Sequence, residues 1–84
     1  MNNLTDIAVF VQVVDSGSFT NAADQLGLSR AVVSKSITRL EARLGARLLH
    51  RTTRRLSLTE AGAALYERSR GALSQIEEVE LEIG

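Results

Sequence analysis

The chain has 84 residues, with ten basic and ten acidic side chains, one histidine and no cysteine. This length allows one domain at most, and the missing cysteines exclude a disulfide framework and thiolate metal ligands. No apolar run is long enough to span a membrane and no secretory leader is recognisable, so we expect a cytoplasmic protein without a membrane partner.

The neutral net charge conceals an uneven distribution of charge along the chain. Residues 1–28 contain aspartates and no cation, and residues 60–84 contain more acidic than basic side chains. Between them, residues 29–55 contain a single acidic residue, Glu41. The basic residues of this segment are Arg30, Lys35, Arg39, Arg43, Arg47, Arg51, Arg54 and Arg55. A local excess of cations of this kind favours contact with a polyanion.

The first predicted helix covers about Leu4 to Asp15, with Asn3 as its cap and Asp6 in its first turn, where an acidic side chain suits the helix dipole. Its inner face is expected to consist of Leu4, Ala8, Val11 and Val14. Gly17 ends this helix. The β-branched run VFVQVV at residues 9–14 is also compatible with a buried strand, but the cap signals and the helical spacing favour the helix.

Two further helices are predicted to form a helix-turn-helix. Ser18 caps a short helix over Phe19–Leu26, and Ser29 caps a third helix that continues to Leu44 before Gly45. The expected inner residues are Ala22, Ala23 and Leu26 on the short helix and Val33, Ile37, Leu40 and Leu44 on the third. The motif needs a small residue at the helix crossing, a turn residue tolerant of positive φ and a branched plug, and Ala23, Gly27 and Val33 supply them.

The carboxy-terminal third is predicted to hold a hairpin and a long helix. Leu48 and Leu49 face Leu56 and Leu58 across a polar tip, and Thr59 caps the last helix. A heptad register gives that helix a seam that is weak at Gly62 and Ser69 and apolar later. The seam residues expected at a dimer interface are Leu65, Ala72, Ile76, Val79 and Ile83.

The candidate functional surface is the outer side of the third helix together with the hairpin tip. The outer side carries Ala31, Lys35, Thr38, Arg39 and Ala42, with Val32 and Ser34 at its flanks. Small residues permit close approach to the major groove of DNA, while hydroxyl and cationic groups contact base edges or phosphates. Arg51, Arg54 and Arg55 at the tip would reach phosphates or the minor groove. A solvated basic helix face is the alternative reading of the same charges.

Residues 16–62, SGSFTNAADQLGLSRAVVSKSITRLEARLGARLLHRTTRRLSLTEAG, closely resemble the amino-terminal winged helix-turn-helix of LysR-type transcriptional regulators. The resemblance rests on Ser18, Ala22, Ala23, Ser29, Val33, Ser34, Ile37, Leu40, Glu41, Leu44, Gly45, Leu48, Arg51, Arg54, Leu58, Thr59 and Gly62. The chain departs from the family pattern at Arg30, Ala31 and Val32, where the family commonly has glutamine, proline and alanine, and at Leu49, where it has phenylalanine. These departures bear on base preference and not on the fold.

The resemblance implies a mainly α-helical winged helix-turn-helix over residues 1–58, made of a three-helix core and a β-hairpin wing, and a linker helix for dimerisation over residues 59–84. The implied partners are double-stranded DNA with a roughly twofold site and a second copy of the chain; a small-molecule effector would bind a carboxy-terminal domain beyond residue 84. No cofactor is expected. The expected DNA-binding residues are Ser29, Arg30, Ala31, Val32, Ser34, Lys35, Thr38, Arg39, Arg51, Thr52, Thr53, Arg54 and Arg55.

Other functions have less support from the sequence. One histidine and scattered carboxylates assemble neither a catalytic nor a metal site, so we expect no enzyme. A protein-interaction module remains an alternative, although the outer side of the third helix lacks the aromatic anchors of an interface core. A basic membrane-surface helix is a weaker option for the same reason. Glu41 is expected in a structural ion pair, His50 at the surface, and Tyr66 and Leu73 in packing contacts.

Overall fold

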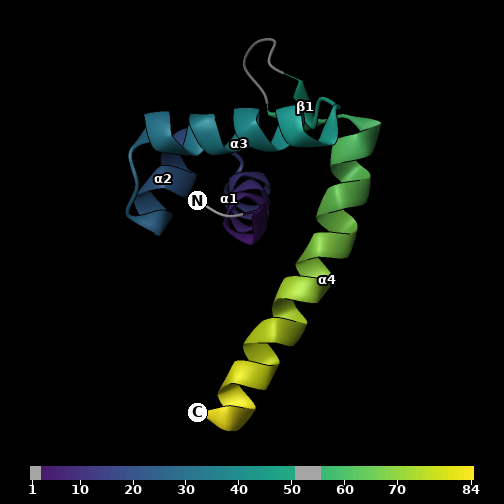
Figure 1. Cartoon of the computed structure of the whole chain (residues 1–84). Coiled ribbons are helices and arrows are strands. Elements are labelled where there is room, and N and C mark those ends of the chain that lie inside the picture. The colour runs from purple at the N-terminus through teal and green to yellow at the C-terminus, as the bar shows by residue number, and fades with distance from the viewer. Residues whose placement is uncertain (1–2, 51–55) are drawn as a thin grey trace.

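A computed structural model describes residues 3–50 and 56–84 of the chain (Figure 1). Four helices and one antiparallel pair of strands make up this part of the molecule. In chain order they are α1 (Asn3–Ser16), α2 (Phe19–Leu26), α3 (Arg30–Leu44), β1 (Leu49–His50), β2 (Ser57–Leu58) and α4 (Glu60–Ile83). The run VFVQVV is helical, as its spacing predicts, but Asn3 is the first residue of α1 and not its cap.

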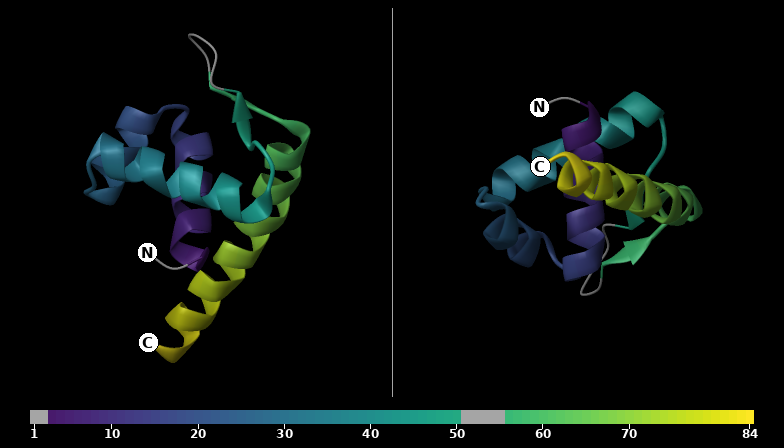
Figure 2. Two further views of the ribbon diagram at one scale, coloured as in Figure 1. Left: turned by 45° about the horizontal axis from the view of Figure 1, so that its top comes forward. Right: turned by 90° about the horizontal axis from the view of Figure 1, so that it is seen from below.

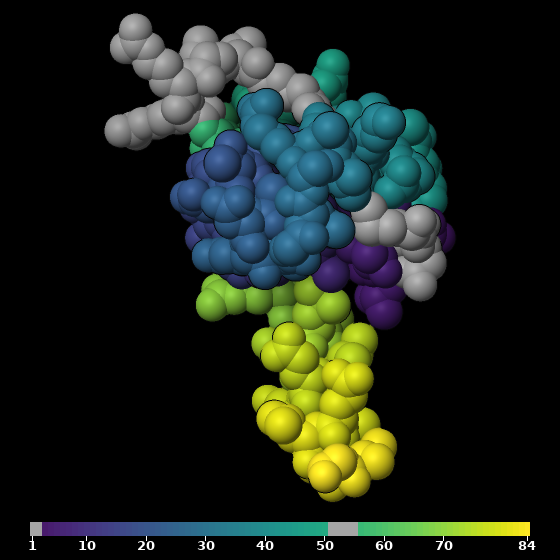
Figure 3. Space-filling view, turned by 90° about the vertical axis from the view of Figure 1, so that its left-hand side faces the viewer, coloured from purple at the N-terminus to yellow at the C-terminus, as the bar shows by residue number. Residues whose placement is uncertain are grey.

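The three helices α1, α2 and α3 pack together into a body, and α4 leaves it as a projecting arm. The strands lie beside the carboxy-terminal end of α3, and α4 starts there and runs to the opposite side of the molecule (Figures 1 and 2). The second half of α4 extends well beyond the body (Figure 3), which gives the molecule extents of 43 × 26 × 21 Å. No helix within the two described stretches is both long and apolar enough to cross a membrane.

Side-chain caps begin three of the helices where the sequence predicts them. The hydroxyl oxygens of Ser18, Ser29 and Thr59 accept hydrogen bonds from backbone N–H groups three residues later, at 2.9, 3.1 and 3.0 Å. Each bond satisfies a donor that the first helical turn leaves without a partner. Gly27 has φ 68°, so the turn between α2 and α3 uses the left-handed conformation that glycine adopts without strain.

The core differs from the prediction on α1. Val9, Phe10 and Val13 of this helix are buried together with the carboxylate of Asp6, and the predicted Val11 is buried as well, whereas Leu4 is 52% exposed. Because α1 is apolar on most of its circumference, spacing alone does not fix its inner face. Its Phe10 side packs against the other body helices, and part of the predicted face lies toward α4 instead, where Ala8 and Val11 line a cleft with Leu73.

The expected inner faces of α2 and α3 are right except at their last residues. Ala22, Ala23, Val33, Ile37 and Leu40 are buried, but Leu26 and Leu44 are exposed. Each exposed leucine directly precedes a left-handed glycine at which the chain turns away from the core. The apolar pattern of each helix therefore extends one residue past the part that the body covers, and its last leucine stays exposed.

The predicted hairpin is present, and its register pairs Leu49 with Leu58 and His50 with Ser57, while Leu48 and Leu56 lie just outside the strands. The buried Glu41 of α3 supports it, because its Oε2 accepts hydrogen bonds from the backbone N–H groups of Leu48 at 2.8 Å and Leu49 at 3.4 Å. Arg47 lies 3.9 Å from the other carboxylate oxygen. Glu41 thus has the structural role that was predicted for it, with backbone groups as its main partners.

Candidate nucleic-acid interface

The turn between α2 and α3 fixes the direction of α3. Val33 is fully buried and Ala23 is nearly so, which lets the two helices approach closely at this point. The backbone N–H of Leu28 also donates to the carbonyl of Ala23 at 2.9 Å and closes the turn. This confirms the predicted helix-turn-helix, because the small residue, the left-handed glycine and the branched plug occupy the positions the motif requires.

One side of α3 remains open to solvent along its length. Its exposed residues are Ala31, Val32, Lys35, Thr38, Arg39, Ala42 and Arg43, and Ser34 is half-buried beside them. Ser29 and Arg30 are exposed where the helix begins, and the guanidinium of Arg30 lies 5.9 Å from the centre of the Phe19 ring on α2. A cation over an aromatic face at this distance is attracted to it, which holds the Arg30 side chain at the amino-terminal end of the exposed side.

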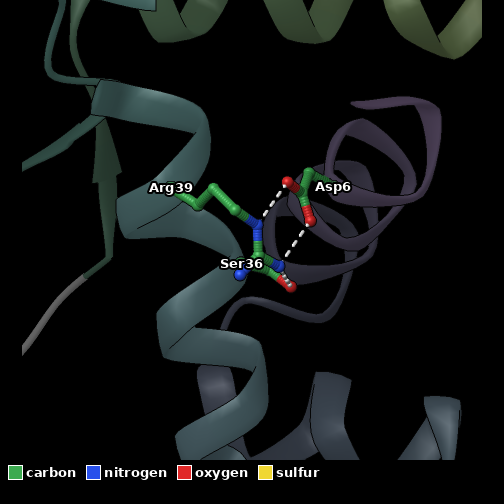
Figure 4. A network of polar contacts seen from close by, with 3 residues as sticks. All are labelled: Asp6, Ser36 and Arg39. Carbon is green, nitrogen blue, oxygen red and sulfur yellow. Dashed lines mark hydrogen bonds and ion pairs between the residues drawn. The ribbon is translucent and has the colours of Figure 1, made fainter. Parts of the chain in front are cut away.

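Arg39 is held by an ion pair with a carboxylate of another helix. Its Nε and Nη2 donate to Asp6 Oδ2 and Oδ1, both at 2.9 Å, and Nη2 also lies 3.3 Å from Ser36 Oγ (Figure 4). The partner of Arg39 is thus Asp6 of α1 and not the nearby Glu41 of its own helix. The paired charge explains two shifts: the hydrogen bond from Arg39 lowers the pKa of Asp6, and the bond to Asp6 raises the pKa of Arg39.

The second candidate region is the tip of the hairpin. His50 is exposed on β1, as expected. The predicted tip residues Arg51, Thr52, Thr53, Arg54 and Arg55 lie outside the described residues. The strands β1 and β2, which flank this segment in the sequence, lie beside the carboxy-terminal end of α3 (Figure 1).

Comparison with known proteins identifies the family to which this arrangement belongs. The family described as "Bacterial regulatory helix-turn-helix protein, lysR family" matches residues 4–63. The chain belongs to the LysR family. An HTH-type transcriptional regulator of Xanthomonas campestris pv. campestris is 51% identical over 83 residues, which cover 99% of this chain and 24% of that protein. An HTH-type transcriptional repressor of Pseudomonas aeruginosa is 55% identical over 80 residues, 95% of this chain and 25% of its own length.

Solved structures of LysR-type proteins share the fold. The BenM DNA-binding domain in complex with catB site 1 DNA matches with a TM-score of 0.91 and 34% identity, over 99% of this chain and 92% of that chain. CrgA, a LysR-type transcriptional regulator from Neisseria meningitidis, matches with a TM-score of 0.78 and 48% identity, over 94% of this chain and 27% of that chain. This LysR-family chain spans about a quarter of the length of the curated relatives named above.

In this LysR-family chain, α4 has two differently placed halves. The first half is fastened to the body: the Tyr66 hydroxyl donates a hydrogen bond to the carboxylate of Asp15, which raises the pKa of Tyr66. Leu65, Tyr66 and Leu73 pack against the core, so the packing expected for Tyr66 and Leu73 is confirmed. Leu65 was predicted at a dimer interface, but in this structure it is half-buried against its own body.

The second half of α4 carries the remaining seam residues on an open surface. Ala72, Ile76, Val79 and Ile83 are exposed, and a shallow groove runs between Ala72, Gln75, Ile76, Val79 and Glu80. Gly62 and Ser69 occupy the weak early seam positions, and both are buried toward the body. The three-helix body therefore covers the small seam residues Gly62 and Ser69 in the first half of α4. The apolar seam residues in the second half of α4 lie beyond the body and are exposed.

Sequence reasoning did not assign Asp6 and Ser36 to the site, although a signal for both was present. Asp6 precedes Val9, Phe10 and Val13 by three, four and seven residues, and Ser36 lies between Val33 and Ile37. Both polar residues therefore fall at core-facing positions of their helices. A carboxylate in such a position needs a partner, and Arg39 lies one helical turn after Ser36.

Proposed function

We propose that this LysR-family chain binds double-stranded DNA, with α3 in the major groove and the hairpin, here called the wing, on the backbone or minor groove. The observation that carries the proposal is the open side of α3, which is lined by small residues, hydroxyls and cations and is directed outward by a tight turn. The buried side chain of Val33 and the buried Ala23, where α2 and α3 cross, hold this helix to the body. The likeness to the BenM domain in its DNA complex supports the same reading.

The residues have different roles in this proposal. Ala31 permits close approach, Lys35 and Thr38 lie near the centre of the open side, and the hydroxyl of Ser34 at its flank is close enough to read base edges with them. Ser29, Arg30, Val32 and Arg39 lie at its margins, where the phosphates that flank a groove would run. Wing residues 51–55 would add contacts to phosphates that do not depend on sequence.

The division of the chain into residues 1–58 and residues 59–84 has a functional meaning in this proposal. The first part reads DNA, and the second joins two copies through the exposed apolar residues of α4. A twofold dimer would place its two recognition helices about one DNA turn apart, roughly 34 Å, or a multiple of it. The longer protein would then act as a transcriptional regulator, and any effector would bind outside this chain.

Selection of bound duplexes from a random pool tests the proposal and identifies the target together. Affinity for the selected duplex should fall steeply with salt, because each neutralised phosphate contributes about −0.9 to the slope of log affinity against log salt. Lys35→Ala should change the preference among duplexes, by about 1–3 kcal/mol if Lys35 pairs with a base, and Arg54→Ala should weaken all duplexes similarly. A pool without enrichment, or binding that is insensitive to salt, would contradict the proposal.

A further inference from the structure

The geometry points to a positioning role for Asp6: its carboxylate holds the guanidinium of Arg39 so that Nη1 is presented to a DNA phosphate at the edge of α3. This inference rests on the proposed DNA binding and names a residue, on a different helix, that would act through a contact residue. Asp6 belongs to α1 and is buried, with 1% of its surface exposed. It would not touch DNA itself.

The hydrogen bonds of Arg39 leave a defined part of the guanidinium free. An arginine has five N–H donors in a rigid plane. Asp6 accepts one from Nε and one from Nη2, and Ser36 Oγ lies within reach of the second Nη2 hydrogen. The two remaining donors both belong to Nη1, for which the described residues offer no further hydrogen-bond partner, and Figure 4 shows this nitrogen turned away from Asp6.

The position of Arg39 on α3 makes this free nitrogen useful. Arg39 follows Lys35 by one helical turn and therefore lies on the same side of the helix, at its border with α1. The Arg39 side chain is 46% exposed although its other two nitrogens are bound. A helix in the major groove runs between two phosphate walls, and phosphates receive half or more of the hydrogen bonds in protein–DNA interfaces.

Asp6 has two opposing effects on such a contact. Its negative charge weakens the attraction between Arg39 and DNA, as any nearby anion would. Its bidentate hydrogen bonding fixes the plane of the guanidinium, so the Arg39 side chain loses less rotamer freedom when it binds a phosphate. The second effect is the larger in this inference, because two hydrogen bonds of 2.9 Å hold the guanidinium in one orientation.

Removal of the Asp6 charge distinguishes these effects by the direction of the change in affinity. In Asp6→Asn the carboxylate becomes a neutral amide of nearly the same shape, and duplex affinity should fall by about threefold or more as the bidentate hydrogen bonding is lost. Asp24→Asn is the matched control, because Asp24 is exposed on α2 and loses the same charge. This control should bind with equal or slightly higher affinity, as expected when an anion is removed from a protein that binds a polyanion.

A double-mutant cycle tests whether Asp6 acts through Arg39. Arg39→Met should reduce the magnitude of the salt slope by about 0.9, the contribution of one phosphate. In the Arg39→Met background, Asp6→Asn should cause no further loss of affinity. Thermal unfolding of each variant verifies that the protein is folded at the temperature of the binding measurement, so a purely structural effect is separated from a change in the contact.

A second pair of variants applies if Asp6→Asn does not fold. Arg39→Lys keeps a cation beside Asp6 but loses the planar fork, so binding should weaken by about threefold at unchanged net charge. Arg68→Lys, at an exposed position of α4 outside the proposed DNA-binding surface, should bind as the wild type does. The positioning role of Asp6 is overturned, and the proposed DNA binding is not, by either of two results. In the first, Asp6→Asn binds more tightly than the wild type to the same degree as Asp24→Asn; in the second, Arg39→Lys binds as tightly as the wild type. A wild-type chain that binds no duplex overturns the proposed function as well.

Discussion

Gly62 on α4 lies directly against the backbone of Leu48, which leads into the wing. A Cβ atom at Gly62 would lie 2.0 Å from the Leu48 carbonyl oxygen and 2.9 Å from its carbonyl carbon. Such a contact with backbone atoms is not relieved by rotation of a side chain. The absence of a side chain at Gly62 therefore allows α4 to start at this distance from the body.

The first prediction follows from this contact. Gly62→Ala should lower the free energy of unfolding by about 3 kcal/mol, because either α4 or the Leu48 segment has to move. Gly71→Ala is the control on the same helix, since nothing lies within 4 Å of the position. It should raise stability by about 0.5–1 kcal/mol through helix propensity. Urea unfolding at one protein concentration measures both, and equal effects would contradict the packing described here.

A second prediction compares two apolar residues of α3. Ile37 is fully buried, whereas Leu44 is 43% exposed. Ile37→Ala should destabilise the protein by about 2–5 kcal/mol, while Leu44→Ala should cost less than about 1 kcal/mol. Helical spacing alone places both residues in the core, whereas in the structure only Ile37 lies there. The free energies of unfolding of the two variants, measured by heat or urea, decide which is right. A large loss in Leu44→Ala would favour the spacing.

The ion pair of Asp6 and Arg39 should make stability depend on pH in acid. The pKa of Asp6 is lowered from its ordinary value of 3.8, so its contribution is complete above the unfolded pKa and is lost as pH falls through the folded pKa. In Asp6→Asn this contribution is absent. The difference in unfolding free energy between wild type and Asp6→Asn should therefore stay constant well above pH 3.8 and narrow as the pH falls below that value. A difference that stays constant in acid as well would show that the carboxylate charge contributes no stability.

The oligomeric state can be tested by two charge insertions on the free half of α4. Val79 is 51% exposed on the seam side, and Leu81 is 80% exposed on the opposite side of the helix. Val79→Glu should turn a dimer into a monomer in sedimentation at roughly micromolar concentration, because the charge would be buried between two seams. Leu81→Glu should sediment as the wild type does. A monomeric wild type, or a dimer that survives Val79→Glu, would contradict the seam.

Local sequence signals were sufficient for the order and ends of the elements. Ser18, Ser29 and Thr59 each cap a helix because a hydroxyl next to a helical run satisfies a backbone N–H three residues on. Gly27 and Gly45 end helices in the left-handed conformation, which depends mainly on the absence of a Cβ atom. These properties belong to a few neighbouring residues, so they can be predicted without knowledge of the rest of the molecule.

The tertiary structure alone decided which face of each helix is covered and which charges are paired. Spacing placed Leu4 and Leu44 inward, but the body ends before it reaches them. The partner of Arg39 is Asp6, 33 residues earlier in the chain, and no local pattern relates the two. Burial and pairing depend on contacts between segments distant in sequence, and those contacts exist only once α1 has packed across α3.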